Sequence, residues 1–165
     1  MKYPIKPLIL AAATSTFSFS VLSAEIKNVI FMIGDGMGPQ QVGLLETYAN
    51  HAPHSIYNGE TTALYKLAQE GVVGSSLTHP EDAIVVDSAC SATMLATGIY
   101  TASEVIGIDS NGNHIETVLQ KAKRLGKATG LVSDTRLTHA TPASFAAHQP
   151  HRSLENDIAA DMLET

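Results

Sequence analysis

Hydrophobic residues follow two patterns along the chain, and each pattern predicts a different kind of element. An apolar run rich in β-branched residues, typical of a strand buried on both faces of a parallel sheet, covers 26–34, and two further strands are predicted at 72–77 and 128–133. Apolar residues with helical spacing predict amphipathic helices, and this spacing covers 40–51, 64–70 and 114–125.

Three further helices are predicted from composition and boundary residues, at 87–97, at 141–148 and from 154 onward. A helix followed directly by a strand, as in the second half of the chain, is the unit that builds parallel sheets. The sequence therefore predicts an α/β fold with a mostly parallel central sheet flanked by helices. The last helix meets the end of the chain without a stop signal, so we expect this sheet to be incomplete.

The first 23 residues have the composition of a secretory signal peptide. Lys2 and Lys6 precede an uncharged run over 8–21, and small residues follow at Ser23 and Ala24. A membrane anchor is the alternative, but spanning a bilayer takes about 20 apolar residues and this run is shorter. We expect a periplasmic or secreted protein without a stable membrane span, whose residues 24–165 form the N-terminal part of one truncated domain.

Charge and cysteine content argue against nucleic-acid binding and against a catalytic cysteine. The chain has 10 basic and 16 acidic residues, a net charge of −6, and binding a nucleic-acid backbone requires clustered Lys and Arg. A small phosphorylated substrate needs only one local positive site. The one cysteine, Cys90, cannot form an internal disulfide, and we expect it to pack inside a helix rather than to act in catalysis.

Two side chains near element boundaries are candidates for chemistry. Asp35 lies between two glycines after a predicted strand, at the sheet edge where α/β proteins bind ligands; a metal ligand and a turn aspartate are equally good interpretations. Ser88 begins a predicted helix, where free N–H groups favour an anion, although an N-cap is the commoner role there. No Gly-x-Ser-x-Gly elbow surrounds Ser88, so a metal is the more suitable activator.

The segment Thr138-His139-Ala140-Thr141-Pro142-Ala143 precedes the third candidate, Arg152. A guanidinium can bind phosphate oxygens in pairs. Taken alone, Arg152 is more simply a surface charge and His139 a loop residue.

Read together, these motifs resemble the alkaline phosphatase family, in its secreted bacterial form. The runs GDGMG at 34–38, DSA with SAT and TG over 87–98, and THATPA followed by Arg152 occur in that family's order and approximate spacing. Three ordered motifs are far more specific than any single one.

The resemblance implies two Zn²⁺ ions, one Mg²⁺ ion and a role for each candidate. Asp35 would ligate one zinc and bridge to the magnesium. Ser88 would bind the same zinc and attack the phosphorus, Thr141 would ligate the magnesium, and Arg152 would hold the phosphate oxygens. The position of His139 is aspartate in some bacterial members and histidine in others, so His139 is either a metal ligand or a residue that supports one.

The implied reaction is hydrolysis of small-molecule phosphate monoesters through a phosphoserine intermediate. The family's remaining metal ligands have no matching positions here, so we expect this chain to be inactive on its own. Family members are often dimers, which leaves a homodimer open. The alternatives are another metal-dependent hydrolase of the superfamily, such as a phosphodiesterase, or a non-catalytic binding domain.

Overall fold

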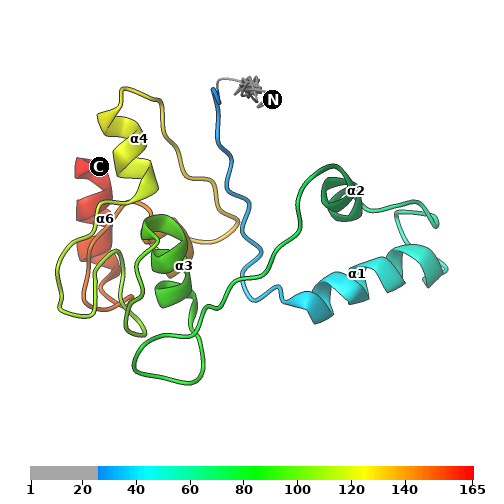
Figure 1. Cartoon of the computed structure of the whole chain (residues 1–165), viewed down its shortest axis with the longest axis horizontal. Helices are drawn as coiled ribbons and strands as arrows, with labels where there is room; N and C mark the ends of the chain where they lie inside the picture. The colour runs from blue at the N-terminus through cyan, green and yellow to red at the C-terminus, as the bar shows by residue number, and fades with distance from the viewer. Residues whose placement is uncertain (1–25) are drawn as a thin grey trace, which may run out of the picture. The chain divides into compact units, whose positions relative to one another are not determined.

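The computed structural model describes residues 26–165, so the expected signal peptide at 1–23 lies outside the described residues. Residues 26–33 are separate from one larger unit, Gly34–Thr165. The helices of that unit, shown in Figure 1, are α1 (Pro39–His51), α2 (Ala63–Glu70), α3 (Ser88–Thr97), α4 (Val118–Arg124), α5 (Ala140–Ala143) and α6 (Glu155–Glu164). Among the described residues no helix is both long and apolar enough to span a bilayer.

The predicted central sheet is not formed within residues 26–165, which contain two isolated β-bridges and no strand. The three predicted strands, at 26–34, 72–77 and 128–133, are irregular and their apolar side chains are exposed: 83% for Ile30, 101% for Val72 and 100% for Val132. A buried strand needs hydrogen-bonding neighbours and covered faces, and no described segment provides them. The described part of the chain therefore does not confirm the predicted sheet.

Four of the six predicted helices are confirmed to within a residue or two, and two are shorter than predicted. Helix α4 begins only at Val118 because Thr117 caps it: the Thr117 hydroxyl accepts a hydrogen bond from the Gln120 N–H over 3.2 Å. Helix α5 ends at Ala143 because the chain then turns to pair Gln149 with Ile106 through two backbone hydrogen bonds of 2.9 Å.

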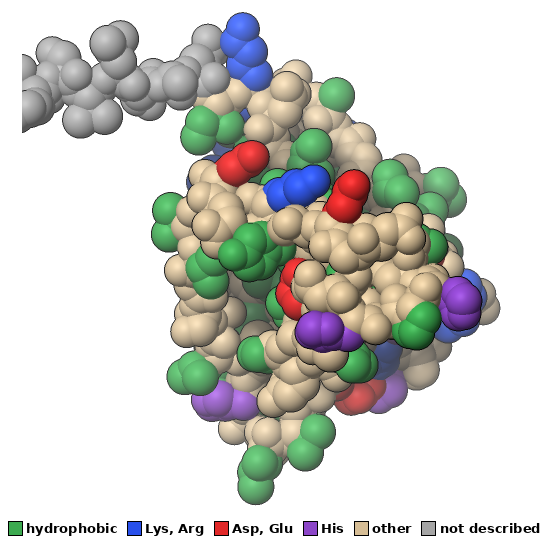
Figure 2. All heavy atoms as spheres, turned by 90° about the vertical axis from the view of Figure 1, so that its right-hand side faces the viewer, with side chains coloured by type: hydrophobic (Ala, Val, Ile, Leu, Met, Phe, Trp, Pro, Cys, Tyr) green, Lys and Arg blue, Asp and Glu red, His purple; other side chains and the backbone are tan. Residues whose placement is uncertain are grey.

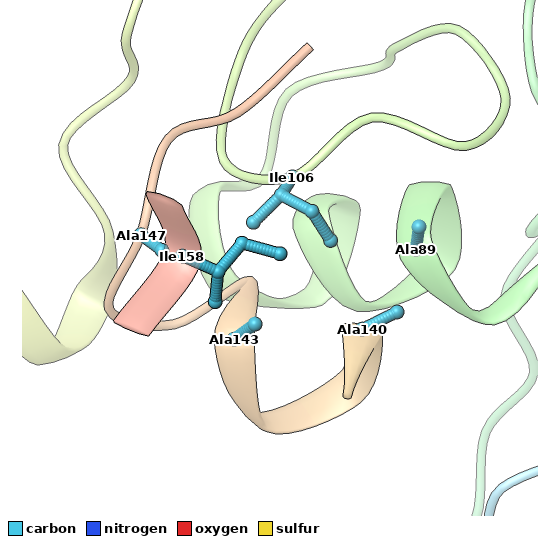
Figure 3. Close-up of a cluster of buried hydrophobic side chains, with 6 residues drawn as sticks. All are labelled: Ala89, Ile106, Ala140, Ala143, Ala147 and Ile158. Carbon is cyan, nitrogen blue, oxygen red and sulfur yellow. The ribbon is translucent and has the colours of Figure 1, made fainter. Parts of the chain in front are cut away.

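The core lies where α3, α5 and α6 meet. It is built from Ala89, Ile106, Ala140, Ala143, Ala147 and Ile158, all at most 1% exposed. Figure 3 shows the two isoleucines directed toward each other, with the alanines of α3 and α5 around them. Alanine methyl groups allow helix backbones to approach closely, so this core fixes how the start of α3 lies against α5.

Apolar side chains are also exposed on α1 and α2. Leu44 is 68% and Leu67 57% exposed. Figure 2 views the molecule from the side on which Figure 1 shows these two helices, and hydrophobic side chains interrupt the polar surface of that face. The two helices are joined by a hydrogen bond from the Thr62 hydroxyl to the Glu46 carboxylate.

Candidate functional site

Ser88 is the first residue of α3, and Asp87 caps that helix. One carboxylate oxygen of Asp87 accepts hydrogen bonds from the N–H groups of Ala89, at 2.7 Å, and Cys90, at 3.1 Å. The Ser88 side chain is half-buried, and its hydroxyl makes no hydrogen bond to the residues that the structure describes. This hydroxyl therefore lies at the positive end of a ten-residue helix and is free to meet an anion.

The Asp87 carboxylate also connects α3 to two residues outside it. Its second oxygen accepts a hydrogen bond from the Glu104 N–H over 2.9 Å, and its first lies 3.8 Å from Nη1 of Arg152. Burial alone would raise the pKa of Asp87, but the hydrogen bonds from Glu104, Cys90 and Ala89 outweigh it and lower the pKa. Asp87 is therefore a carboxylate that faces Arg152 immediately beside Ser88.

Arg152 is surrounded on three sides by polar side chains. Nη1 faces Asp87, Nε lies 3.8 Å from Oε2 of Glu104, and Nη2 lies 3.3 Å from Nε2 of His139. A guanidinium can only donate, so Nε2 of His139 accepts this hydrogen bond and the ring proton of a neutral His139 is on Nδ1. The Arg152 side chain is 22% exposed, which leaves its donors partly open to a bound anion.

Asp35 and Thr141 form the second contact between predicted residues. The Thr141 hydroxyl donates to Oδ2 of Asp35 over 3.0 Å. Asp35 lies in the turn before α1, where Gly36 has a φ of +69° that glycine adopts without steric cost. Three predicted motifs are thus connected in the structure: Thr141 contacts Asp35, and Arg152, which follows Thr141 in the chain, faces Asp87 beside Ser88.

Two buried hydroxyl groups hold the start of α3 against α5. Oγ of Ser144 donates to the carbonyl of Ala140 over 2.9 Å and lies 3.3 Å from the carbonyl of Ala89. The Thr93 hydroxyl lies 3.2 Å from Oγ of Ser144 and accepts a hydrogen bond from the Gly107 N–H over 3.0 Å. Because Ala89 follows Ser88 and Ala140 precedes Thr141, these contacts fix the spacing between the two candidate side chains.

Glu104 was not among the residues predicted from the sequence, and Asp87 was included only in the DSA run at the start of the predicted helix 87–97. The adjacency of Asp87 and Ser88 was a usable signal, because a cap residue also presents its carboxylate outside the helix. Glu104 carried no comparable signal, since its contacts depend on a left-handed backbone conformation with a φ of +63°.

The donors present fit part of a metal site. Asp35 and Thr141 direct two oxygens toward one another, and oxygen ligands are those that Mg²⁺ prefers. Zinc takes three or four His, Cys or carboxylate ligands, and residues 26–165 contain no group of three such side chains that could hold a metal ion. The described residues therefore fit a partial magnesium site and do not by themselves complete a zinc site.

Comparisons with known proteins agree on one family. The family model described as alkaline phosphatase matches residues 26–164. A curated relative, alkaline phosphatase 4 of Bacillus subtilis, is 41% identical over 140 residues, which are 82% of this chain and 29% of the relative. The cold-active alkaline phosphatase of Shewanella sp. superimposes with a TM-score of 0.68 at 36% identity, over 80% of this chain and 32% of its own.

A second similar structure contains a metal ion. It is a variant of the alkaline phosphatase from TAB5 with Mg bound, and it matches with a TM-score of 0.52 at 38% identity over 53% of this chain and 25% of its own. The chain thus spans about a third or less of the length of these three proteins.

Proposed function

This chain belongs to the alkaline phosphatase family, and from that premise we propose that it carries the nucleophile and the phosphate-binding arginine of a phosphate monoesterase. The substrates would be small-molecule phosphate monoesters. The observation that supports this most strongly is the position of Arg152, whose Nη1 lies 3.8 Å from the carboxylate of Asp87, the residue that caps the helix beginning at Ser88.

In the proposed reaction Ser88 is the nucleophile. Its Oγ forms a bond to phosphorus, the bond from phosphorus to the ester oxygen breaks, and the hydroxyl proton ends on the alcohol product. Water then attacks the phosphoserine, which releases inorganic phosphate and restores the Ser88 hydroxyl. The start of α3 and the Arg152 guanidinium stabilise the charge on the phosphoryl oxygens, which is the main task of an enzyme in phosphoryl transfer.

We further propose two zinc ions and one magnesium ion as cofactors. Asp35 and Thr141 would hold the magnesium, Asp35 and Ser88 would contribute to one zinc site, and His139 would contact a metal or support a ligand. Bound metal ions would supply charge neutralisation and a lowered pKa for the nucleophile. The other ligands would lie in the part of the family domain that this chain does not span.

The same proposal accounts for the exposed apolar segments at 26–34, 72–77 and 128–133. The relatives are longer, so residues beyond the matched part could form strands that pair with such segments. A parallel sheet would then bury both faces of each segment. Export through a signal peptide at 1–23, and a periplasmic or extracellular location, belong to the proposal as well.

A hybrid enzyme tests the role of Ser88. In this hybrid, residues 26–164 of the chain replace the matching segment of the Bacillus subtilis relative. The rate of hydrolysis of the monoester 4-nitrophenyl phosphate is compared with that of the diester bis(4-nitrophenyl) phosphate. We expect monoesterase activity that Ser88→Ala lowers on the order of a thousandfold or more, because the nucleophile is lost. Ser91→Ala is the matched control, since Ser91 is in the same helix and its hydroxyl donates to the backbone of Asp87.

The outcomes are distinct. An active hybrid in which Ser88→Ala leaves the rate unchanged would disprove the nucleophile, and a preference for the diester would favour a phosphodiesterase. The chain alone, residues 24–165, is expected to show no hydrolysis.

A further inference from the structure

Glu104 has a backbone conformation that glutamate rarely adopts. Its φ is +63°, in the left-handed region where a side chain crowds the backbone and glycine is favoured. Strained residues of this kind persist where the surrounding structure holds them, and they cluster at functional sites. Glu104 lies beside Arg152, so the conformation occurs next to the proposed phosphate site.

Two backbone hydrogen bonds hold Glu104 in place. Its N–H donates to Oδ2 of Asp87 over 2.9 Å, and its carbonyl accepts from the N–H of Arg152 over 2.8 Å. A glycine would make both bonds without the steric cost. The backbone therefore explains the conformation and does not explain why the residue is a glutamate.

The Glu104 side chain adds a carboxylate that faces the arginine. Oε2 of Glu104 lies 3.8 Å from Nε of Arg152, and the side chain is 44% exposed. Asp87 faces Nη1 of the same guanidinium, so the single positive charge of Arg152 faces two carboxylates. The group formed by Arg152, Asp87 and Glu104 therefore carries a net negative charge before any phosphate binds.

We propose that Glu104 sets the affinity of the site for phosphate: its carboxylate competes with a phosphate dianion for Arg152 and weakens the binding of the product. This inference rests on the proposed function, because it takes Arg152 as the residue that binds phosphate. Weakened product binding matters to a phosphatase, since release of product limits the turnover of many enzymes.

The size of the effect follows from the charges involved. A carboxylate and a phosphate dianion held on the same guanidinium repel each other, and solvent screens them at an exposed position. Removal of the carboxylate charge is expected to lower the dissociation constant for phosphate about threefold to tenfold. The effect should diminish as salt rises, because the Debye length falls to a few ångströms near 1 M.

The experiment is a titration of the whole chain with inorganic phosphate, followed through the Nε–Hε NMR signal of Arg152. Wild type, Glu104→Gln and Glu104→Gly are compared at about 0.02 M and about 0.5 M salt. Glu104→Gln retains the shape and the backbone strain and removes the charge, whereas Glu104→Gly removes both. We expect both variants to bind phosphate more tightly than wild type at low salt, by a similar factor, and the difference to shrink at high salt.

Each other result decides against the inference. Equal affinity in wild type and Glu104→Gln, with the Arg152 signal still responding to phosphate, would overturn the role of Glu104 and leave the proposed function intact. Tighter binding in Glu104→Gly alone, independent of salt, would assign the effect to the backbone. An Arg152 signal that responds to phosphate in no variant would overturn both this inference and the phosphate-binding role of Arg152.

Discussion

The hydroxyl of Thr141 donates a hydrogen bond to the carboxylate of Asp35 over 3.0 Å, and the two residues are 106 positions apart in the chain. Asp35 lies in the turn before α1 and Thr141 in the short helix α5. Two oxygens from distant segments are thereby held at one point. We expect this point to be where the chain first binds a divalent cation.

Removal of the Thr141 hydroxyl should weaken magnesium binding. Thr141→Val has the same shape without the proposed ligand oxygen. We expect the affinity of the chain for Mg²⁺ to fall at least about tenfold, because even the loss of a residue that only orients a metal ligand costs that much. Isothermal titration with MgCl₂ measures it. Thr47→Val is the matched control, because Thr47 is exposed on α1 and its hydroxyl donates within its own helix. Equal losses in the two variants would exclude a specific role for Thr141.

The candidate site was more predictable than the fold around it. Asp35, Ser88, Thr141 and Arg152 lie in short motifs whose order is visible in the sequence, and the structure connects Asp35 with Thr141 and links Arg152 to the residue before Ser88. The contacts of Glu104 were not predictable, because a positive φ at a non-glycine residue leaves no mark in the sequence.

The predicted strands are absent from residues 26–165 for a physical reason. An apolar run such as 26–34 indicates that a segment tends to be buried, but it does not specify the segment that would cover it. Helices carry their own hydrogen bonds and caps, so the predicted helix starts agree with the structure to within one residue except at α4, where the cap Thr117 lies inside the predicted helix 114–125. Pairing between distant strands has no such local signal.

Cys90 should be an unreactive thiol. It is fully buried, and burial raises its pKa to about 11. At pH 8 roughly one thiol in a thousand is then ionised, and only the thiolate reacts. We expect modification by a disulfide reagent to be at least about a hundredfold slower in the folded chain than in guanidinium. The chain has one cysteine, so the signal is unambiguous; similar rates in the two states would contradict the burial.

Glu155 should titrate well below an ordinary glutamate. Hydrogen bonds from Arg136, at 2.8 and 2.9 Å, and from the Thr138 hydroxyl, at 2.6 Å, lower its pKa to about 2. Because the pKa of Glu155 is lower in the folded chain than in the unfolded chain, ionised Glu155 stabilises the fold. This contribution is complete above about pH 4.5 and is lost as the pH falls toward 2. Arg136→Gln should raise the pKa of Glu155 toward its ordinary value, which carbon NMR of the carboxyl group measures.

A second ion pair provides the control for that experiment. Glu116 accepts a hydrogen bond from Arg124 over 2.7 Å, which lowers the pKa of Glu116 in the same direction. Arg136→Gln should leave the titration of Glu116 unchanged. A Glu155 that titrates near pH 4 in the wild-type chain would show that the loop before His139 is not held by α6.

Gly107 should be far less tolerant of alanine than Gly98, although both have a positive φ, +59° and +74°. A Cβ at Gly107 would lie 2.1 Å from the carbonyl oxygen of Ala147, whereas nothing lies within 4 Å of a Cβ at Gly98. Gly98→Ala then carries only the left-handed backbone cost of about 1–2 kcal/mol. Gly107→Ala must also displace the backbone at Ala147, so we expect its free energy of unfolding in urea to fall by roughly 3 kcal/mol or more. Equal losses of stability in the two variants would mean that the loop at Gly107 does not pack against the segment that follows α5. The contact between Ile106 and Ala147 in the core that fixes Ser88 against Thr141 would then be in doubt.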